Sequence, residues 1–250
     1  MARATVIAYH AVGDCPSDDD PYNMFVSPRQ FRRQMAFLAR WRSVVALDAL
    51  LAGDIPRKRP AVAITFDDGY RSVLTEASPV LHAYGFPATV FVPTAFVGRR
   101  SEWLPPSSCS LEIMLPEELR EAEDLGIAVE SHGHAHIDFL RAGRAEAEFD
   151  LRASIEGLAG IVARRPRYLA YPFGPSSPEA RAAAEDCGFD AAFSIDALEE
   201  GPYARERVQI TPLDGLLAFA LKTSGRYLAR RHSVLGSRAT SLVRPLRRKR

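Results

Sequence analysis

The chain has 250 residues, of which 47% are hydrophobic and 25% charged. These proportions are ordinary for a globular protein, and the length suffices for one large α/β domain or two small ones. The longest apolar run, residues 88–98, contains Pro93 and is too short for a transmembrane helix. The first residues lead directly into a predicted strand, without the apolar core and cleavage site of a signal peptide, so we expect a cytoplasmic protein.

The three cysteines are Cys15, Cys109 and Cys187. Their number is odd, they lie far apart, and none belongs to a Cys-x-x-Cys pair. This pattern predicts reduced thiols rather than a disulfide framework or a cysteine-ligated metal.

The net charge of +1 hides an uneven distribution. From Lys222 onward there are ten Lys or Arg and no Asp or Glu, whereas the preceding 221 residues carry 22 basic and 31 acidic residues, a net charge of −9. We therefore divide the chain into a folded domain, residues 1–221, and a basic tail, residues 222–250. An anionic partner suits the tail, with the inner face of a membrane favoured over nucleic acid, and a solvated, frayed terminus is the simpler alternative.

Short β-branched strands alternate with helices along the chain. The predicted strands cover residues 6–9, 44–45, 62–66, 88–92, 127–129, 167–171, 191–195 and 208–210. The predicted helices cover residues 27–38, 47–51, 72–84, 116–126, 144–163 and 177–187. The alternation is typical of βα units in a parallel sheet, either open or closed into a barrel.

Two of these helices carry clear boundary signals. Ser27 followed by Pro28 and Gln30 has a cap, a proline at the first helical position and a capping-box glutamine. Gly85 suits the position that ends the helix over residues 72–84, in which Pro79 predicts a break or kink.

The apolar strand 62–66 ends in two adjacent carboxylates, Asp67 and Asp68, followed by Gly69 and Tyr70. Burying two like charges side by side is costly unless a positive group neutralises them, and a metal ion is the usual one. Both carboxylates can reach one site only if the backbone turns, which Gly69 allows. The alternative is an exposed Asp-Asp-Gly turn that merely ends the strand.

Three histidines, His132, His134 and His136, alternate directly after another strand. In a helical turn His132 and His136 would face one metal and His134 would point away, whereas in an extended strand all three would share a face. Two histidines and one carboxylate suit a borderline divalent ion, of which Zn²⁺ is the best match, and leave coordination positions open for water.

Motif residues therefore follow four predicted strands. They are His10, the pair Asp67 and Asp68, the pair His132 and His136, and the run Pro172-Phe173-Gly174, which follows the strand that ends at Tyr171. Because ligands bind at the carboxyl ends of parallel strands, all four sets are expected on one rim.

Three motifs, in this order and spacing, resemble the polysaccharide deacetylases with the NodB homology domain, carbohydrate esterase family 4. They are Thr65-Phe66-Asp67-Asp68-Gly69-Tyr70, His132-x-x-x-His136 and Tyr171-Pro172-Phe173-Gly174, and the resemblance spans roughly residues 5–213. It implies a distorted (β/α) barrel of about seven parallel strands and metal-dependent hydrolysis of an N-acetyl group on an amino sugar. It also implies that Asp67 is the general base and that Asp68, His132 and His136 bind the metal. The run from Tyr171 to Gly174, with Tyr70, is assigned to substrate and oxyanion binding, in which the Phe173 N–H is the oxyanion donor because Pro172 has none.

The chain departs from the family at two positions. Ala170 stands where many members have an arginine, so Asp67 either needs another partner or has a less controlled pKa. The late catalytic histidine of many members has no match within residues 208–214. His10 is the candidate proton donor, with His134 behind it, and Asp67 could also return its own proton.

Two functions follow from these observations. The first is an enzyme that deacetylates an N-acetylated sugar precursor, and the second is a catalytically impaired carbohydrate-binding relative that keeps the metal site. The leucines of residues 213–221 run into the basic tail, a pattern compatible with an anionic membrane surface, although packing against the barrel would also explain them.

Overall fold

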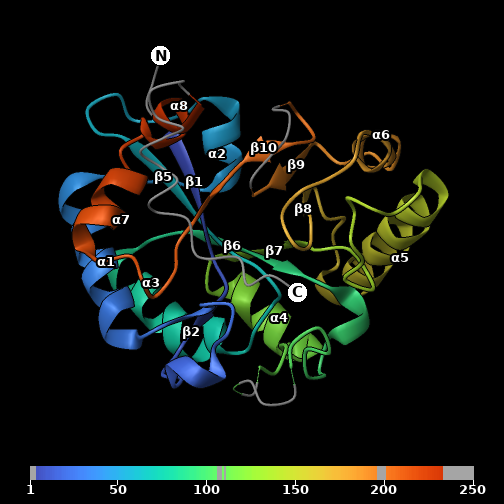
Figure 1. The fold of residues 1–250 in the computed structure, drawn as a ribbon, viewed down its shortest axis with the longest axis horizontal. Coiled ribbons are helices and arrows are strands. Elements are labelled where there is room, and N and C mark those ends of the chain that lie inside the picture. The colour runs from blue at the N-terminus through green and yellow to red at the C-terminus, as the bar shows by residue number, and fades with distance from the viewer. Residues whose placement is uncertain (1–3, 106–108, 110, 196–200, 233–250) are drawn as a thin grey trace.

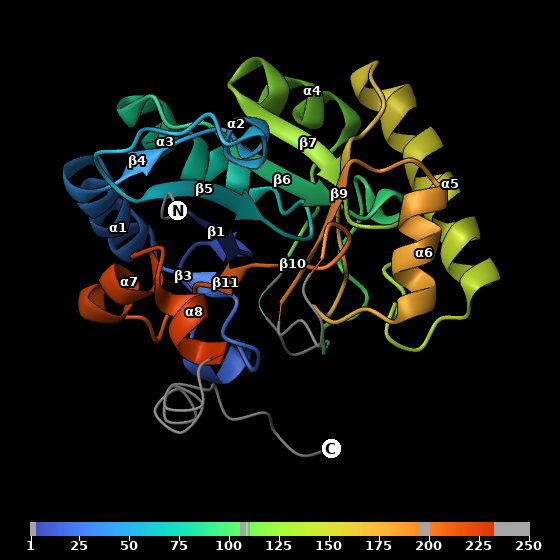
Figure 2. The same cartoon turned by 90° about the horizontal axis from the view of Figure 1, so that it is seen from above.

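A computed structural model of the protein describes residues 4–105, 109, 111–195 and 201–232. One nine-stranded sheet runs in the order β10-β9-β8-β7-β6-β5-β1-β11, with β4 beside β5. All of its strand pairs are parallel, and it curls into a nearly closed barrel with helices on the outside (Figures 1 and 2). The predicted distorted (β/α) barrel is confirmed.

The strands are β1 (Ala4–Tyr9), β2 (Ala11–Val12), β3 (Phe25–Val26), β4 (Ser43–Val44), β5 (Ala61–Phe66), β6 (Ala88–Val92), β7 (Ile127–Ser131), β8 (Tyr168–Ala170), β9 (Ala191–Ser194), β10 (Arg205–Glu206) and β11 (Val208–Gln209). The α-helices are α1 (Pro28–Trp41), α2 (Leu47–Ala52), α3 (Ser78–Tyr84), α4 (Pro116–Asp124), α5 (Arg144–Val162), α6 (Pro178–Asp186), α7 (Leu216–Lys222) and α8 (Tyr227–His232). Short 3₁₀ turns cover Ser17–Asp19 and Thr94–Phe96.

The two edges of the nearly closed barrel are linked in the chain by one residue. Strands β10 and β11 are the two edge strands of the sheet, since β10 pairs with β9 and β11 pairs with β1. Only Arg207 separates them in the chain. We call this position the seam.

Strand registers bring the carboxyl ends of the central strands together. Tyr9 of β1 lies opposite Phe66 of β5, and Val92 of β6 lies opposite Ser131 of β7. All six residues of β5 are buried, as a strand covered on both faces requires. The residues that follow each strand therefore emerge side by side on one rim.

Helix boundaries follow the sequence signals closely. The Ser27 hydroxyl accepts a hydrogen bond from the Gln30 N–H at 3.2 Å, and Gly85 ends α3 in the left-handed region at φ +62°. The helix predicted over residues 72–84 is confirmed, although its first half is a π-helical turn over Val73–Ala77 that leads directly into α3. Pro79 lies in the first turn of α3, where its missing N–H is tolerated.

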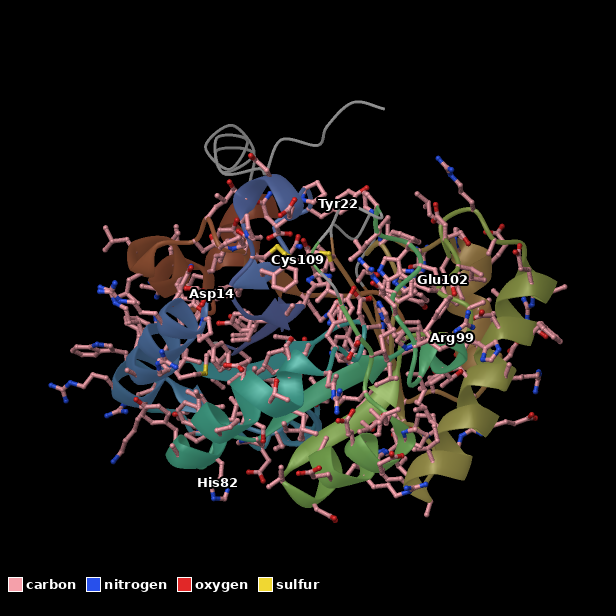
Figure 3. All side chains as sticks on the ribbon, turned by 90° about the horizontal axis from the view of Figure 1, so that it is seen from below. Asp14, Tyr22, His82, Arg99, Glu102 and Cys109 are labelled. Atoms are coloured by element: carbon pink, nitrogen blue, oxygen red, sulfur yellow. A yellow bond between two sulfur atoms is a disulfide. The ribbon has the colours of Figure 1, made fainter. Side chains whose placement is uncertain are left out.

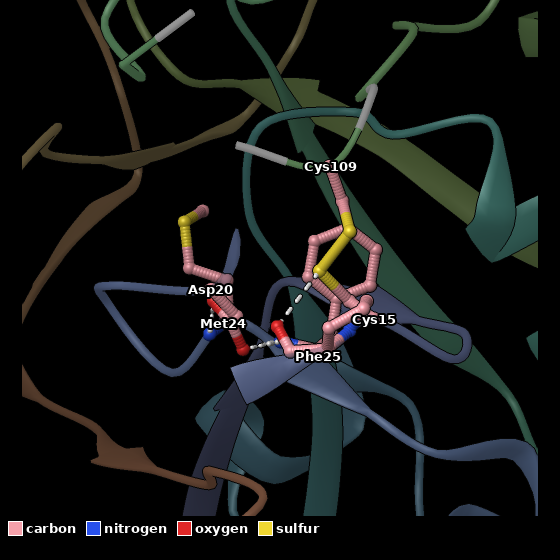
Figure 4. Close-up of a disulfide and its surroundings, with 6 residues drawn as sticks. Cys15, Asp20, Met24, Phe25 and Cys109 are labelled. Atoms are coloured by element: carbon pink, nitrogen blue, oxygen red, sulfur yellow. Dashed lines mark hydrogen bonds between the residues drawn. A yellow bond between two sulfur atoms is a disulfide. The ribbon is translucent and has the colours of Figure 1, made fainter. Parts of the chain in front are cut away.

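The prediction of reduced thiols is wrong, because Cys15 and Cys109 form a disulfide (Figure 4). The two residues are 94 positions apart, and the Cys109 N–H also donates to the Asp19 carbonyl at 3.2 Å. Their proximity arises only when the segment after β6 crosses the loop after β2, which spacing in the sequence does not reveal. Cys187 is free and buried.

We call residues 97–105, 109 and 111–115 the rim segment. It is fastened to the turn after β5, since the Met114 N–H donates to the Gly69 carbonyl at 3.0 Å and Ile113 bridges to Tyr70. At its exposed edge Arg99 and Glu102 form an ion pair (Figure 3).

The boundary predicted after residue 221 carries no break in the described fold. The Thr223 carbonyl accepts a hydrogen bond from Arg42 of the loop after α1 at 2.7 Å, and α8 follows. Residues 233–250 of the predicted tail lie outside the described residues. Among the helices that are described, none combines the length and hydrophobicity needed to cross a bilayer.

Candidate metal centre and active site

Asp68, His132 and His136 converge at the rim, as the sequence analysis expected. Asp68 Oδ1 lies 3.1 Å from His136 Nε2 and 3.3 Å from His132 Nε2. All three side chains are buried, and one ligand atom from each lies within 4.8 Å of the others. Within the described part of the chain this is the cluster with metal-ligand geometry.

The backbone turns sharply at each ligand segment. Asp68 and Gly69 have φ values of +68° and +67°, and His136 has +52°. Left-handed backbone is rare for residues other than glycine and is concentrated at functional sites. At Gly69 an added Cβ would lie 3.1 Å from the Val92 side chain, so the close turn needs glycine there.

The tautomer of His132 argues for a cation in this cluster. His132 Nδ1 lies 2.7 Å from the Ala170 carbonyl oxygen, which can only accept, so Nδ1 carries the proton. In the neutral ring Nε2 then points a lone pair at the Asp68 carboxylate. Two lone pairs facing each other in a buried site call for a positive ion between them, and a carboxylate with two imidazoles is a donor set that Zn²⁺ accepts.

Burial and hydrogen bonding also set the charges of the ligands. Burial would raise the pKa of Asp68, but its interactions with the His132 and His136 rings outweigh burial and hold that pKa well below its ordinary value. Burial lowers the pKa of His136 in spite of the Asp68 charge. A neutral imidazole and an ionised carboxylate are the forms that bind metals.

The rim segment covers one ligand. Trp103 stacks on the His136 ring with centroids 3.8 Å apart and planes 7° from parallel. His134, the third histidine, points away, with Nδ1 2.7 Å from Thr94 Oγ1. Of the two arrangements that the sequence left open, the loop therefore has the turn-like one, in which His132 and His136 face one site and His134 does not.

Asp67 is held by a different group. Arg207, at the seam, binds both Asp67 oxygens, with Nη1 2.7 Å from Oδ1 and Nη2 2.8 Å from Oδ2. Both side chains are buried, and Nη1 also donates to Thr65 Oγ1 at 3.1 Å. Burial would raise the pKa of Asp67, but the charge and hydrogen bonds of Arg207, together with nearby histidines, outweigh burial and keep that pKa below its ordinary value.

Sequence reasoning missed Arg207. In the run Arg205-Glu206-Arg207 it looks like one of several surface charges near a short strand. The only signal was indirect, since Ala170 left Asp67 without its usual partner.

His10 lies beside the two carboxylates. It directly follows β1, and the Asp67 N–H donates to the Tyr9 carbonyl at 2.9 Å. The charge of His10 contributes to lowering the pKa of Asp67 and of Asp68. His10 Nδ1 is buried without a hydrogen-bond partner, so the ring has an unused polar atom.

The Tyr171-to-Gly174 run divides between the site and the core. Phe173, at φ +62° and 58% exposed, lies edge-on to the His136 ring at 4.8 Å. Tyr171 is buried, and its hydroxyl donates to the Tyr203 carbonyl at 3.0 Å, away from the metal ligands. Pro172 and Gly174 are buried, and a Cβ on Gly174 would lie 2.7 Å from the Ile195 carbonyl oxygen. Of the four, Phe173 is the one whose side chain reaches the site.

Tyr70 is fully buried behind Asp68, and its hydroxyl has no hydrogen-bond partner of good geometry. Burial and the nearby Asp68 charge raise the pKa of Tyr70 well above its ordinary value, so the phenol stays protonated. Tyr70 also lines a hollow of about 560 Å³ with Phe25, Arg71 and Glu112.

Comparisons with known proteins agree with this geometry. The family model described as "Polysaccharide deacetylase" matches residues 54–192. The poly-beta-1,6-N-acetyl-D-glucosamine N-deacetylase of Staphylococcus aureus is 26% identical over 188 residues, covering 70% of this chain and 62% of the staphylococcal protein, so this chain spans less than two thirds of that relative.

Two solved structures share the fold. IcaB from Ammonifex degensii superimposes with a TM-score of 0.73 and 26% identity, covering 90% of this chain and 98% of IcaB. The Streptococcus pyogenes deacetylase PplD, in complex with acetate, gives a TM-score of 0.75 at 19% identity, covering 88% of this chain and 97% of PplD.

Proposed function

This chain belongs to the polysaccharide deacetylase family, and from that membership we propose that it removes N-acetyl groups from an amino sugar or polysaccharide precursor by metal-dependent hydrolysis. One observation carries the proposal: a buried Asp-His-His donor set lies directly beside a second carboxylate that is already neutralised by arginine. The two carboxylates are thereby available for different tasks.

Asp68, His132 and His136 would hold one divalent ion, for which Zn²⁺ is our proposal. Such an ion, when bound, acidifies water and polarises an amide carbonyl. His132 is oriented for this task by its hydrogen bond to Ala170, and the stacked Trp103 shields His136 from solvent.

Asp67 is the proposed general base. Arg207 keeps its carboxylate ionised and aimed, so Asp67 accepts the proton of the attacking water. The Phe173 N–H is the proposed donor to the developing oxyanion, and the left-handed backbone at Phe173 sets the direction of that peptide.

His10 is the proposed proton donor to the leaving amine. Its unpartnered Nδ1 and its position beside Asp67 support this role, because a general acid needs a ring nitrogen that is not committed to the fold. The products are acetate and a free amino sugar.

The alternative hypothesis, a catalytically impaired carbohydrate-binding relative, has lost one of the two observations that supported it. It rested on the missing arginine and the missing late histidine, and Arg207 occupies the role of the first. The two functions predict different kinetics, so they can be separated directly.

The test combines metal analysis with acetate release. Purified protein, loaded with Zn²⁺, should contain about one ion per chain and release acetate from N-acetylglucosamine oligomers. Elemental analysis checks the ion, and an acetate assay with and without chelator checks the reaction. A protein that binds Zn²⁺ and the oligomer but releases no acetate would support the binding relative instead.

We also propose an anionic membrane as a partner of the C-terminal region. Leu213 and Leu217 are 69% and 89% exposed, with Leu216 and Leu221 also exposed, so packing against the barrel does not account for them. Apolar side chains that precede a basic segment suit an anionic lipid surface.

Co-sedimentation with phosphatidylcholine vesicles, with and without phosphatidylserine, tests this partner. The variant Leu213→Ser with Leu217→Ser should lose phosphatidylserine-dependent binding. Phe149→Ser removes an equally exposed apolar side chain from α5 and is the matched control, which should bind as wild type does. Equal binding of all three proteins would remove the membrane proposal.

The compartment stays a proposal as well. A cytoplasmic compartment would keep the cysteines reduced, whereas Cys15 and Cys109 are joined. Disulfides persist in oxidising compartments, so we propose that this domain works in one. Thiol labelling of protein from its native cells should find one free cysteine, and three would restore the cytoplasmic assignment.

A further inference from the structure

Helix α5 presents two buried polar side chains to the loop that carries both histidine ligands. Its buried face is otherwise apolar, with Ala147, Leu151 and Leu158 packed in the core. Asp150 and Ser154 stand one helical turn apart on the same face and are both buried. A buried carboxylate on an apolar helix face is costly unless it binds something.

Asp150 binds the backbone between the two ligands. Its Oδ2 accepts from the His134 N–H at 2.7 Å, and its Oδ1 accepts from the Ala135 N–H at 2.8 Å. Ser131 Oγ accepts from the Gly133 N–H at 3.1 Å and bonds to Ser154 Oγ at 2.6 Å. All three N–H groups of residues 133–135 are therefore satisfied by side chains, two of them by Asp150 alone.

The loop is wrapped closely around this carboxylate. Gly133 has φ +73°, and a Cβ built on it would lie 2.7 Å from Asp150 Oδ2. On the opposite side, the Thr94 and Ala95 N–H groups donate to the Gly133 and His134 carbonyls at 3.2 and 3.0 Å. The path from His132 to His136 is thus fixed from both sides without regular secondary structure.

We propose that Asp150 is a positioning residue for the metal centre: by gathering the loop N–H groups it fixes the spacing and aim of His132 and His136. The inference rests on the metal site of the proposed function. Partners of this outer kind contribute roughly 10–100-fold to metal affinity. The hydrogen bonds of Asp150 in the described structure go to the loop backbone and not to the ring of a metal ligand, so Asp150 acts through the loop.

The test is Asp150→Asn, which keeps the shape but replaces one acceptor oxygen by an NH₂ group that faces a backbone donor. We expect Zn²⁺ affinity to fall by roughly 10–100-fold. Chelator competition measures the affinity in the absence of substrate, and Trp103 fluorescence reports the event locally because Trp103 stacks on His136.

Glu130→Gln is the matched control. Glu130 is also a buried carboxylate that accepts two backbone N–H groups, from Arg167 at 2.6 Å and Tyr168 at 2.8 Å, but these residues carry no metal ligand. Its Zn²⁺ affinity should equal that of wild type even if its melting temperature falls. Equal losses of affinity in both variants, or none in Asp150→Asn, would overturn the proposal.

A second pair covers the case in which Asp150→Asn does not fold. Gly133→Ala pushes a methyl group against Asp150, whereas Gly126→Ala has the same left-handed strain, at φ +82°, with no atom within 4 Å. Gly133→Ala should weaken Zn²⁺ binding and Gly126→Ala should not, and equal affinities would contradict the inference. If wild type binds no Zn²⁺ at all, the proposed metal-dependent function fails rather than the role of Asp150.

Discussion

Asp67 and Asp68 are neighbours in the chain, but their carboxylates lie in two differently built regions. Asp67 points toward the seam, where the protein itself supplies a fully buried arginine as the counter-charge. Asp68 points into loops with left-handed backbone, where its partners are two imidazoles.

The difference shows how two buried like charges can coexist. The negative charge of Asp67 is balanced by Arg207 within the fold, so this carboxylate needs no ion from solution. Asp68 faces two imidazole rings, and the His132 ring directs the lone pair of Nε2 at the carboxylate, so Asp68 depends on a cation from outside. The first region is built for a constant charge and the second for a replaceable ion.

Asp67→Asn should have the largest effect on turnover, and it tests whether the two carboxylates have separate roles. The amide cannot accept the proton of water, so turnover should fall by about 10²–10⁴-fold, the usual contribution of a general base. Zn²⁺ content should stay near that of wild type, because Asp67 is not among the ligand atoms. Acetate release and elemental analysis on the same sample measure both.

Asp68→Ala is the control for that result. It should lose Zn²⁺ and turnover together. Loss of metal in Asp67→Asn would show that the two regions are not separable.

Arg207→Met tests the constant-charge region. Removing one partner of a buried ion pair costs about 3–5 kcal/mol of unfolding free energy, because Asp67 remains buried and charged. Without the arginine, burial raises the pKa of Asp67 above the ordinary value of 3.8, and the folded variant then takes up a proton more readily than the unfolded chain.

The loss of unfolding free energy in Arg207→Met should depend on pH. Protonation removes the uncompensated charge, so the deficit should be greatest near neutral pH and shrink as the pH falls toward that raised pKa. Wild-type Asp67, whose pKa is lowered, stays ionised over the same range. Urea unfolding of both proteins from pH 7 to pH 4 measures this, and a constant deficit would mean that the arginine acts through packing alone.

Reducing the disulfide should loosen the region around Asp68. Cys15–Cys109 closes a 94-residue separation, and loss of such a bond costs about 2–4 kcal/mol. Thermal unfolding with and without reductant measures the loss. The double variant Cys15→Ser with Cys109→Ser should show no further shift on reduction, which excludes an effect through Cys187.

Phe173→Ala should have the smallest effect. The side chain is exposed, so unfolding free energy should change by less than about 0.5 kcal/mol. Zn²⁺ affinity should be unchanged, and the backbone N–H remains available for the oxyanion. Chemical denaturation with a metal titration checks this, and a large loss of affinity would place Phe173 among the groups that hold the ligands.

Local motifs carried most of what could be predicted. Asp67, Asp68, His132 and His136 each follow a short apolar strand, and parallel strands place such residues on one rim regardless of detail. Their convergence therefore followed from pattern alone.

Long-range partners were beyond reach for a physical reason. Arg207 finds Asp67 only because β10 and β11 end opposite edges of the sheet, and Cys15 finds Cys109 only because the rim segment crosses the loop after β2. Asp150 was hidden in the periodicity of a long helix, where a buried aspartate looks like an interruption of the apolar face. Each depends on how the elements close in space.

The one-residue link between the edge strands ties the assembly of the barrel to its chemistry. Until β10 and β11 have both docked, Asp67 lacks its arginine partner, and burying its unpaired carboxylate in the apolar interior is energetically costly. Docking of the last two strands therefore completes both the sheet and the ion pair. A chain cut before residue 205 should lose activity and also fail to pack the barrel around Asp67.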